Sequence, residues 1–220
     1  MGEVLIDNLF DLSHTIMANY LKSFKYPWEA LKGLKDEIIK VGNTLSLDEY
    51  SLVGENIWVH KTAKVFDSAY LNGPLIVCEG AEIRHCAFVR GSAVVGKNAV
   101  VGNSVELKNV ILFDNVQTPH YNYVGDSILG YKAHMGAGSI TSNVKSDKTN
   151  VVIHSNQDIE TGLRKVGAFL GDFVEVGCNS VLNPGTIIGR NSNVYPLSSV
   201  RGVVDENSIY KQGEVVKKRM

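Results

Sequence analysis

The chain has 220 residues, of which 44% are hydrophobic and 20% charged, with 22 Lys and Arg against 23 Asp and Glu. This length allows one domain with a small appendage, and the apolar fraction excludes an intrinsically disordered chain. A net charge of −1 argues against nucleic acid as the main ligand, because binding to phosphate backbones requires an excess of basic residues.

Membrane insertion and secretion are not expected. No stretch nears the ~18 uninterrupted apolar residues of a membrane span, and Met1-Gly2-Glu3 opens no signal peptide. The three cysteines, Cys78, Cys86 and Cys178, are odd in number and lack CxxC spacing. This usage indicates a reduced, cytoplasmic protein.

Residues 1–52 are predicted to form a helical segment. Apolar residues recur three and four apart between Leu9 and Leu21, as on one face of a helix. Pro27 fits the first turn of a second helix, because its missing N–H would be unpaired there anyway. This second helix is expected to end near Gly42, as a left-handed cap. The segment carries no recognisable catalytic group.

From residue 57 onward an apolar residue recurs at every sixth position. With 44% apolar residues, sixteen consecutive matches have a chance probability on the order of one in ten thousand. The two runs are Val59, Val65, Leu71, Val77, Ile83, Val89, Val95, Val101, Leu107 and Phe113, and then Leu170, Val176, Leu182, Ile188, Val194 and Val200.

A period of six has a direct structural meaning. Two inward residues with one outward residue between them form a very short strand, because strand side chains alternate between faces. A Gly or polar residue then turns the chain, and three such strands per turn form a triangular prism. We therefore predict a mainly β protein, a parallel β-helix of hexapeptide repeats over residues 53–212, followed by a tail at 213–220.

The repeat is interrupted twice. Sixteen residues separate Phe113 from Leu129, and the disturbed stretch between them contains His120 and Tyr123. The second interruption is a polar loop at 141–166, and long excursions in compact folds are often functional. The ordinary pKa of imidazole, near ~6.5, suits a general base, so His120 is a catalytic candidate in a groove between subunits of a trimer. The alternative is an imidazole packed beneath a bulge.

Three sequence stretches carry a resemblance to a known family: Val101–Lys108, His120–Asp126 and Gly136–Asn143. In this order and spacing, over residues 55–210, the chain resembles the C-terminal acyltransferase-type domain of sugar-1-phosphate nucleotidylyltransferases. Bifunctional glucosamine-1-phosphate acetyltransferase/N-acetylglucosamine-1-phosphate uridylyltransferase is the member it resembles most. The resemblance implies a left-handed β-helix, a homotrimer, acetyl-CoA as acyl donor and no metal.

The resemblance also implies roles for individual residues. Arg90 and Lys108 lie eighteen residues apart, which is one turn of the helix, so they are expected to stack and to clamp a phosphate. The implied groups are the general base His120; the acceptor-binding residues Arg90, Lys108, Tyr123 and His134; and the coenzyme A-binding residues Ala137, Asn143 and Cys178, joined by Arg164 and Lys165 of the loop.

The chain departs from the family pattern in three places. Residues 1–55 lack the Gly-rich nucleotide loop of a nucleotidylyltransferase domain. His134 stands where the bacterial enzymes carry an asparagine that meets the substrate, so the acceptor can differ. The loop 141–166 is longer than theirs, and its Arg164 and Lys165 either reach a neighbouring subunit's site or coenzyme A phosphates, or are solvated.

These observations predict acetyl-CoA-dependent acyl transfer to an amine or hydroxyl of a sugar phosphate or nucleotide sugar. One alternative is a non-catalytic trimeric module that binds sugar phosphates. A minor alternative is a zinc enzyme similar to γ-carbonic anhydrases, in which three histidines converge between subunits. His85, His120 and His134 are the available set, but their spacing does not resemble the ligands of that family.

Overall fold

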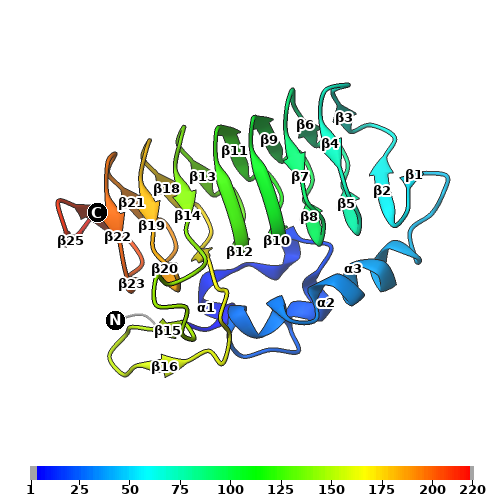
Figure 1. The fold of residues 1–220 in the computed structure, drawn as a ribbon. Coiled ribbons are helices and arrows are strands. Elements are labelled where there is room, and N and C mark those ends of the chain that lie inside the picture. The colour runs from blue at the N-terminus through cyan, green and yellow to red at the C-terminus, as the bar shows by residue number, and fades with distance from the viewer. Residues whose placement is uncertain (1–3, 219–220) are drawn as a thin grey trace.

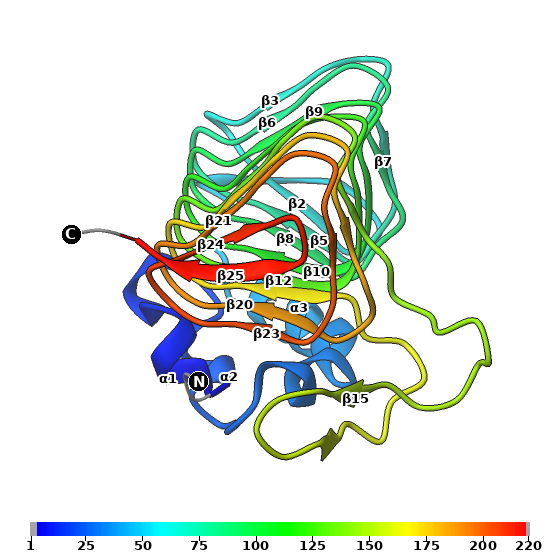
Figure 2. The same ribbon diagram turned by 90° about the vertical axis from the view of Figure 1, so that its left-hand side faces the viewer.

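A computed structural model describes residues 4–218; Arg219 of the basic C-terminal run lies outside the described residues. The protein is a three-sided prism of short, mostly parallel strands, with a helical segment packed along one side (Figures 1 and 2). It is a left-handed β-helix of about nine turns, as the repeat and the family resemblance predict.

Each face of the prism is a ladder of strands. Face one contains β4 (Tyr70–Leu71), β7 (Phe88–Val89), the first halves of β10 (Glu106–Leu112) and β12 (Tyr123–Leu129), β14 (Ile140–Thr141), β19 (Val181–Leu182) and β22 (Ser199–Val200). Face two contains β1 (Tyr50–Gly54), β2 (Ile57–His60), β5 (Leu75–Val77), β8 (Ala93–Val95), the second halves of β10 and β12, β17 (Ala168–Leu170), β20 (Thr186–Ile188) and β23 (Val203–Val204). Face three contains β3 (Lys64–Val65), β6 (Glu82–Ile83), β9 (Val100–Asn103), β11 (Gln117–His120), β13 (His134–Met135), β18 (Glu175–Val176), β21 (Asn193–Val194), β24 (Ser208–Lys211) and β25 (Glu214–Lys217).

The sixth-residue positions form the core. Every member of the two runs is buried except Val65 and Leu71, which are half-buried in the turns that precede the fully enclosed part of the prism. Phe113, the last member of the first run, does not occupy the predicted register. Leu107 pairs with Val89, but Leu112 and not Phe113 pairs with Val95, and Leu112 in turn pairs with Leu129, so two successive turns of the prism are each a residue short.

The shortening lies at the corner between faces one and two. Between β7 and β8 the chain crosses this corner with three residues, Arg90-Gly91-Ser92. In the next two turns it crosses with only two residues, Lys108-Asn109 and then Gly125-Asp126. Strands β10 and β12 therefore continue around this corner. The stretch containing His120 and Tyr123 is regular, contrary to the prediction of a disturbed stretch there, because Thr118 stacks on Val101 in the core.

The N-terminal segment is more broken than its periodicity predicts. It consists of α1 (Ile6–Leu9), a 3-10 turn (Leu12–His14), α2 (Ala18–Leu21), a 3-10 helix (Pro27–Leu31) and α3 (Leu34–Gly42). Leu9–Leu21 is thus not one helix, and Pro27 opens a 3-10 helix that ends before α3 begins. Gly42 is helical rather than left-handed, and Asn43 caps α3.

The segment follows face two because that face has an apolar exterior. The outward residues of its strands form a register-matched ladder, and the N-terminal segment buries them: Trp58, Ile76, Val94, Ile111, Ile128, Phe169 and Ile187. Trp28 lies with its ring centre 6.2 Å from that of Phe169. Figure 2 shows the helices beneath this face. Within residues 4–218, none of the helices has the length and apolar character to cross a membrane.

The inserted loop and the tail both contain strands. The loop forms a hairpin of β15 (Val152–Ile153) and β16 (Ile159–Glu160), which lies beside the corner of faces one and two (Figure 2). Its ends are joined by a hydrogen bond from the amide N of Val166 to the carbonyl O of Asn143, 3.0 Å. The tail returns along face three, where β25 pairs antiparallel with β24.

Candidate functional site

One corner of the prism, between faces three and one, stacks His85, Asn103, His120, Ala137 and Cys178. We call these residues the corner column. The carbonyl of each accepts a hydrogen bond from an amide one turn farther along, at 2.8–3.2 Å. The residue that follows each has a φ between 52° and 71°, which makes the tight left-handed turn. The predicted base therefore shares one edge with two of the residues predicted to bind coenzyme A.

His120 ends β11 and its side chain is exposed. The backbone around it is fixed by buried Asn122, whose Oδ1 accepts from the His120 amide at 3.2 Å and whose Nδ2 donates to the Gly136 carbonyl at 2.8 Å. No described residue hydrogen-bonds the imidazole ring, so the ring is accessible to a ligand on a rigid support. The alternative of an imidazole packed beneath a bulge is wrong.

Arg90 and Lys108 follow neighbouring strands of face one and stack as predicted, with the Arg90 amide donating to the Leu107 carbonyl at 2.9 Å. Both cations have carboxylate partners. Arg90 Nη1 lies 2.8 Å from Glu106 Oε1 at the surface, and this hydrogen bond raises the pKa of the guanidinium. A phosphate bound here would thus share Arg90 with Glu106.

Lys108 makes a tighter pair with Asp126, whose side chain is only 4% exposed. The ammonium lies 2.7 and 2.9 Å from the two carboxylate oxygens. Asn109 and Asn143 donate to the same carboxylate at 2.9 and 2.6 Å. Four hydrogen bonds from three side chains therefore converge on Asp126.

Tyr123 extends this cluster toward the corner column. Its hydroxyl accepts a hydrogen bond from Asn143 Nδ2 at 3.1 Å. Burial raises the pKa of the phenol, so the hydroxyl keeps its proton and can donate it outward. Asn143, which the resemblance places with coenzyme A, thus contacts the predicted acceptor-binding residue Tyr123 as well as Asp126, and it is not in the corner column.

His134 lies apart from the other acceptor residues. It belongs to face three, pairs with Gln117 and Glu175 in register, and its Nδ1 lies 2.8 Å from Glu175 Oε2. Together with Cys178 it lines a depression of about 440 Å³ over β13, β18 and β21. Within one chain, the corner therefore separates His134 from Arg90 and Lys108.

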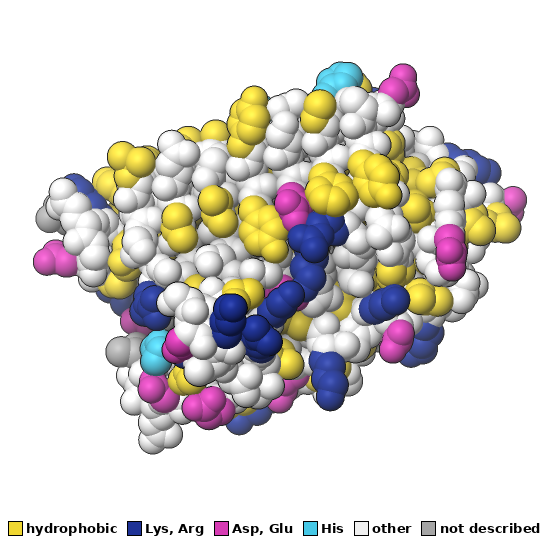
Figure 3. Space-filling view, in the orientation of Figure 1, with side chains coloured by type: hydrophobic (Ala, Val, Ile, Leu, Met, Phe, Trp, Pro, Cys, Tyr) yellow, Lys and Arg dark blue, Asp and Glu magenta, His cyan; other side chains and the backbone are white. Residues whose placement is uncertain are grey.

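Arg164 and Lys165 are exposed on the returning limb of the loop, directly before Val166. Neither has a carboxylate within ion-pair distance among the described residues. In Figure 3, Lys and Arg side chains gather on this side of the molecule, next to hydrophobic side chains over face one. The limb of the loop that carries these two cations returns to the prism beside Asn143 and Asp126, whose carbonyls accept hydrogen bonds from the amides of Val166 and Gly167.

Residues 4–218 contain no group of three or more His, Cys, Asp or Glu arranged to hold a metal ion. The three cysteines are free thiols. Burial raises the pKa of Cys78 to about 12, whereas Cys86 and Cys178 are exposed.

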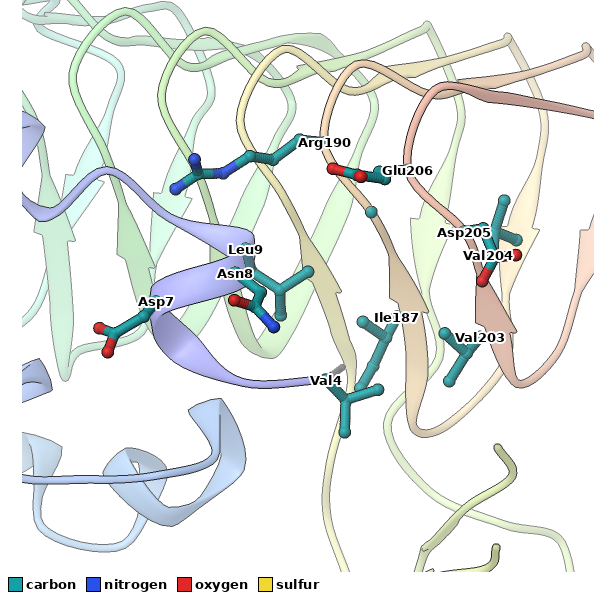
Figure 4. A pocket seen from close by; sticks show the side chains of 11 residues that line it. Val4, Asp7, Asn8, Leu9, Ile187, Arg190, Val203, Val204, Asp205 and Glu206 are labelled. Atoms are coloured by element: carbon teal, nitrogen blue, oxygen red, sulfur yellow. The ribbon is translucent and has the colours of Figure 1, made fainter. Parts of the chain in front are cut away.

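A separate depression of about 370 Å³ lies between α1 and the last turns of the prism (Figure 4). Asp7, Arg190 and Glu206 stand at its rim, and Ile187 and Val203 form part of its apolar wall. It contains none of the predicted site residues.

Sequence reasoning missed Glu106, Asn109 and Asp126. Asp126 closes the same stretch that contains His120 and Tyr123, and it lies eighteen residues after Lys108. The six-residue period was the available signal, although in the structure Lys108 pairs with Gly125, directly before Asp126, because this turn is a residue short.

The chain is similar in sequence to several known proteins. Residues 71–147 match the family described as GMPPB C-terminal domain. The bifunctional protein GlmU of Methanococcus aeolicus is 29% identical over 98% of this chain and 55% of its own length. The bifunctional sugar-1-phosphate nucleotidylyltransferase/acetyltransferase of Sulfurisphaera tokodaii is 27% identical over 80% of this chain and 48% of its own.

The chain spans about half the length of these curated relatives. Among solved structures, the polySia-specific acetyltransferase NeuO aligns with a TM-score of 0.49 and 15% identity, over 71% of this chain and 80% of that one. The repeat, the fold and the relatives agree: the chain is a left-handed β-helix of hexapeptide repeats, and it is similar to the C-terminal acyltransferase-type domain of bifunctional sugar-1-phosphate nucleotidylyltransferases.

Proposed function

We propose that the protein transfers an acetyl group from acetyl-CoA to an amine or hydroxyl of a sugar phosphate or nucleotide sugar, with His120 as general base. The observation that carries this proposal is the position of His120. Its exposed imidazole stands in the corner column next to Ala137, at one edge of face one. Arg90, Lys108, Tyr123 and Asn143, which we call the face-one cluster, follow or belong to strands of that face.

The corner column supports binding of the acyl donor. Ala137 and Cys178 have small side chains, so an extended pantetheine arm can lie along the stacked backbone of the column toward His120. The relatives whose names include acetyltransferase support acetyl as the transferred group. Arg164 and Lys165, which lack carboxylate partners among the described residues, are the cations on this chain best suited to a donor's phosphates.

The face-one cluster supports binding of the acceptor. Arg90 and Lys108 present two stacked cationic groups to a phosphate, and the Tyr123 hydroxyl can donate to a sugar oxygen. Asn143 belongs to this side in our assignment, because its amide bonds Tyr123. His134 on face three reaches an acceptor only across a subunit boundary, so its proposed role requires the homotrimer that the family resemblance implies.

The proposed reaction balances with one base. The imidazole takes the proton of the acceptor amine or hydroxyl as that group attacks the thioester carbonyl. A C–N or C–O bond forms, the C–S bond breaks, and the coenzyme A sulfur leaves as a thiolate. The imidazolium then returns the proton to this thiolate, which regenerates the neutral base.

The test is release of coenzyme A thiol from acetyl-CoA with glucosamine-1-phosphate, galactosamine-1-phosphate and nucleotide-linked amino sugars. We expect release with at least one acceptor and a loss of about 10²- to 10⁴-fold in His120→Ala. His85→Ala is the matched control, because His85 occupies the same corner column two turns away and should retain the wild-type rate.

Two outcomes would contradict the proposal. Thiol release that is unchanged in His120→Ala would remove the base from the mechanism. A wild-type protein that binds a sugar phosphate by calorimetry but releases no thiol with any acceptor would favour a non-catalytic binding module. The ion pairs that Glu106 and Asp126 already make with Arg90 and Lys108 are compatible with such a module.

A further inference from the structure

We infer that Asp126 is the positioning residue of the acceptor site: it holds Lys108 and Asn143, and through Asn143 the Tyr123 hydroxyl, in the arrangement that binds the acceptor. This inference rests on the proposed function. Asp126 itself is 3% exposed. It therefore acts through its neighbours and does not touch the acceptor.

Asp126 lies at a corner of the prism. It occupies the shortened corner between faces one and two, with a φ of 49°. The corner positions in register with it in the following turns are glycines, linked by hydrogen bonds from the Gly167 amide to the Asp126 carbonyl and from the Gly185 amide to the Gly167 carbonyl, both 2.8 Å. In the preceding turn Asn109 takes the same left-handed conformation, with a φ of 56°, and its side chain donates to the Asp126 carboxylate.

The carboxylate connects three turns of the prism. Lys108 comes from the turn before it, and Asn143 comes from the turn after it, at the point where the inserted loop leaves the prism. Asn143 uses the same amide nitrogen to reach Tyr123 and Asp126, at 3.1 and 2.6 Å. One buried charge therefore sets the relative positions of three groups that the proposed acceptor would meet.

The geometry also explains why Lys108 can serve as a phosphate ligand without being mobile. A lysine ammonium on a flexible chain loses conformational entropy when it binds a phosphate. Here the two carboxylate oxygens of Asp126 already fix the ammonium of Lys108. The Lys108 side chain is 26% exposed, so part of it remains open to solvent. Preorganised groups of this kind lower the entropic cost of binding.

The experiment uses steady-state kinetics of the full chain with the best acceptor from the thiol-release assay. In Asp126→Asn, which keeps the shape and removes the charge, we expect the acceptor KM to rise about 10- to 100-fold. The KM for acetyl-CoA should stay within about twofold, because the corner column does not contact Asp126. Asp172→Asn is the matched control, since Asp172 is also buried and ion-paired, 3.4 Å from Arg190, at a different corner.

A double-mutant cycle separates positioning from general structural damage. If Asp126 acts through Lys108, then Asp126→Asn should add less than about threefold to the acceptor KM in a Lys108→Met background. Full additivity, or equal changes in the KM values of both substrates, would overturn the inference. If Asp126→Asn does not fold, Asp126→Glu keeps the charge and displaces it by one methylene, and an unchanged acceptor KM in that variant would overturn the inference as well.

The two proposals fail differently. An active wild type whose acceptor KM is insensitive to residue 126 leaves the function standing and removes the positioning role. A wild type that neither transfers acetyl nor binds a sugar phosphate removes the acceptor site, and the inference about Asp126 is overturned with it.

Discussion

Faces one and two of the prism share strands β10 and β12 but differ in what their outward side chains meet. On face two the outward ladder is apolar, and the N-terminal segment covers Ile111 and Phe169 completely. On face one the corresponding ladder mixes Phe88, Glu106 and Tyr123, and it is half-buried or exposed. The comparison shows that the inward residues define the fold, whereas the outward residues decide which face is structural and which is available for ligands.

The largest expected effect tests this difference in stability. Phe169→Ala on the covered face should lower the free energy of unfolding by about 3–5 kcal/mol, because a large buried ring is lost and a cavity remains. Phe88→Ala on the open face should cost less than about 1 kcal/mol, since its ring is 41% exposed. Urea unfolding of both variants measures the two values. Equal losses would mean that face one is also covered in the protein in solution.

A second comparison concerns binding on the open face. Arg90→Met should raise the KM for a phosphorylated acceptor about 10- to 100-fold, because it removes a charge-assisted hydrogen bond to the phosphate. Stability should change little, since the Arg90–Glu106 pair is exposed. Arg201→Met is the control: Arg201 follows β22 as Arg90 follows β7, and it is exposed far along the same face. A comparable KM change in both variants would show that face one attracts phosphate only through its overall charge.

The smallest expected effect concerns pH. Burial raises the pKa of Asp172, which lies against the N-terminal segment and accepts a hydrogen bond from the Asp11 amide at 2.7 Å. A raised pKa means that the folded state favours the protonated carboxyl. This contribution to stability is present below the unfolded-state pKa of about 3.9 and is lost as pH rises through the folded-state pKa.

Asp172→Asn removes this titration. Relative to the wild type, the variant should therefore gain stability between pH 4 and neutral pH, when both are measured by urea unfolding. Asp67→Asn, at an exposed turn of the prism, is the control and should follow the wild-type pH profile. A profile of Asp172→Asn that is parallel to the wild type would show that the carboxyl does not titrate differently on folding.

The core could be predicted from the sequence because a hexapeptide repeat is a local rule repeated many times. Burial of residues such as Val95 and Leu182 follows directly from the period. The count failed between Leu107 and Leu112, because a period does not report which corner is one residue short. The predicted bounds of the helices in the N-terminal segment were wrong for a related reason, because the breaks between these helices follow the shape of the face that they cover.

The candidate site was predicted unevenly. The stacking of Arg90 on Lys108 follows from their one-turn spacing in the repeat. The exposure of His120 was only one of two alternatives, because the sequence suggested that the repeat is disturbed around it, whereas the structure keeps the repeat there. The partners Glu106 and Asp126 were missed, because contacts between successive turns depend on side-chain reach as well as on spacing. The position of Asn143 beside Tyr123 could not be read from the sequence, since an inserted loop of unknown path leaves the prism next to it.

The continuous course of β10 and β12 has a mechanical consequence. At other corners the chain leaves one ladder before it joins the next, so adjacent faces can shear slightly against each other. Where β10 and β12 turn without leaving their hydrogen-bonding register, faces one and two become a single fourteen-stranded sheet. We therefore expect the turns that carry Lys108 and Tyr123 to resist such shear, and amide hydrogen exchange to be slower there than in the other turns of residues 4–218.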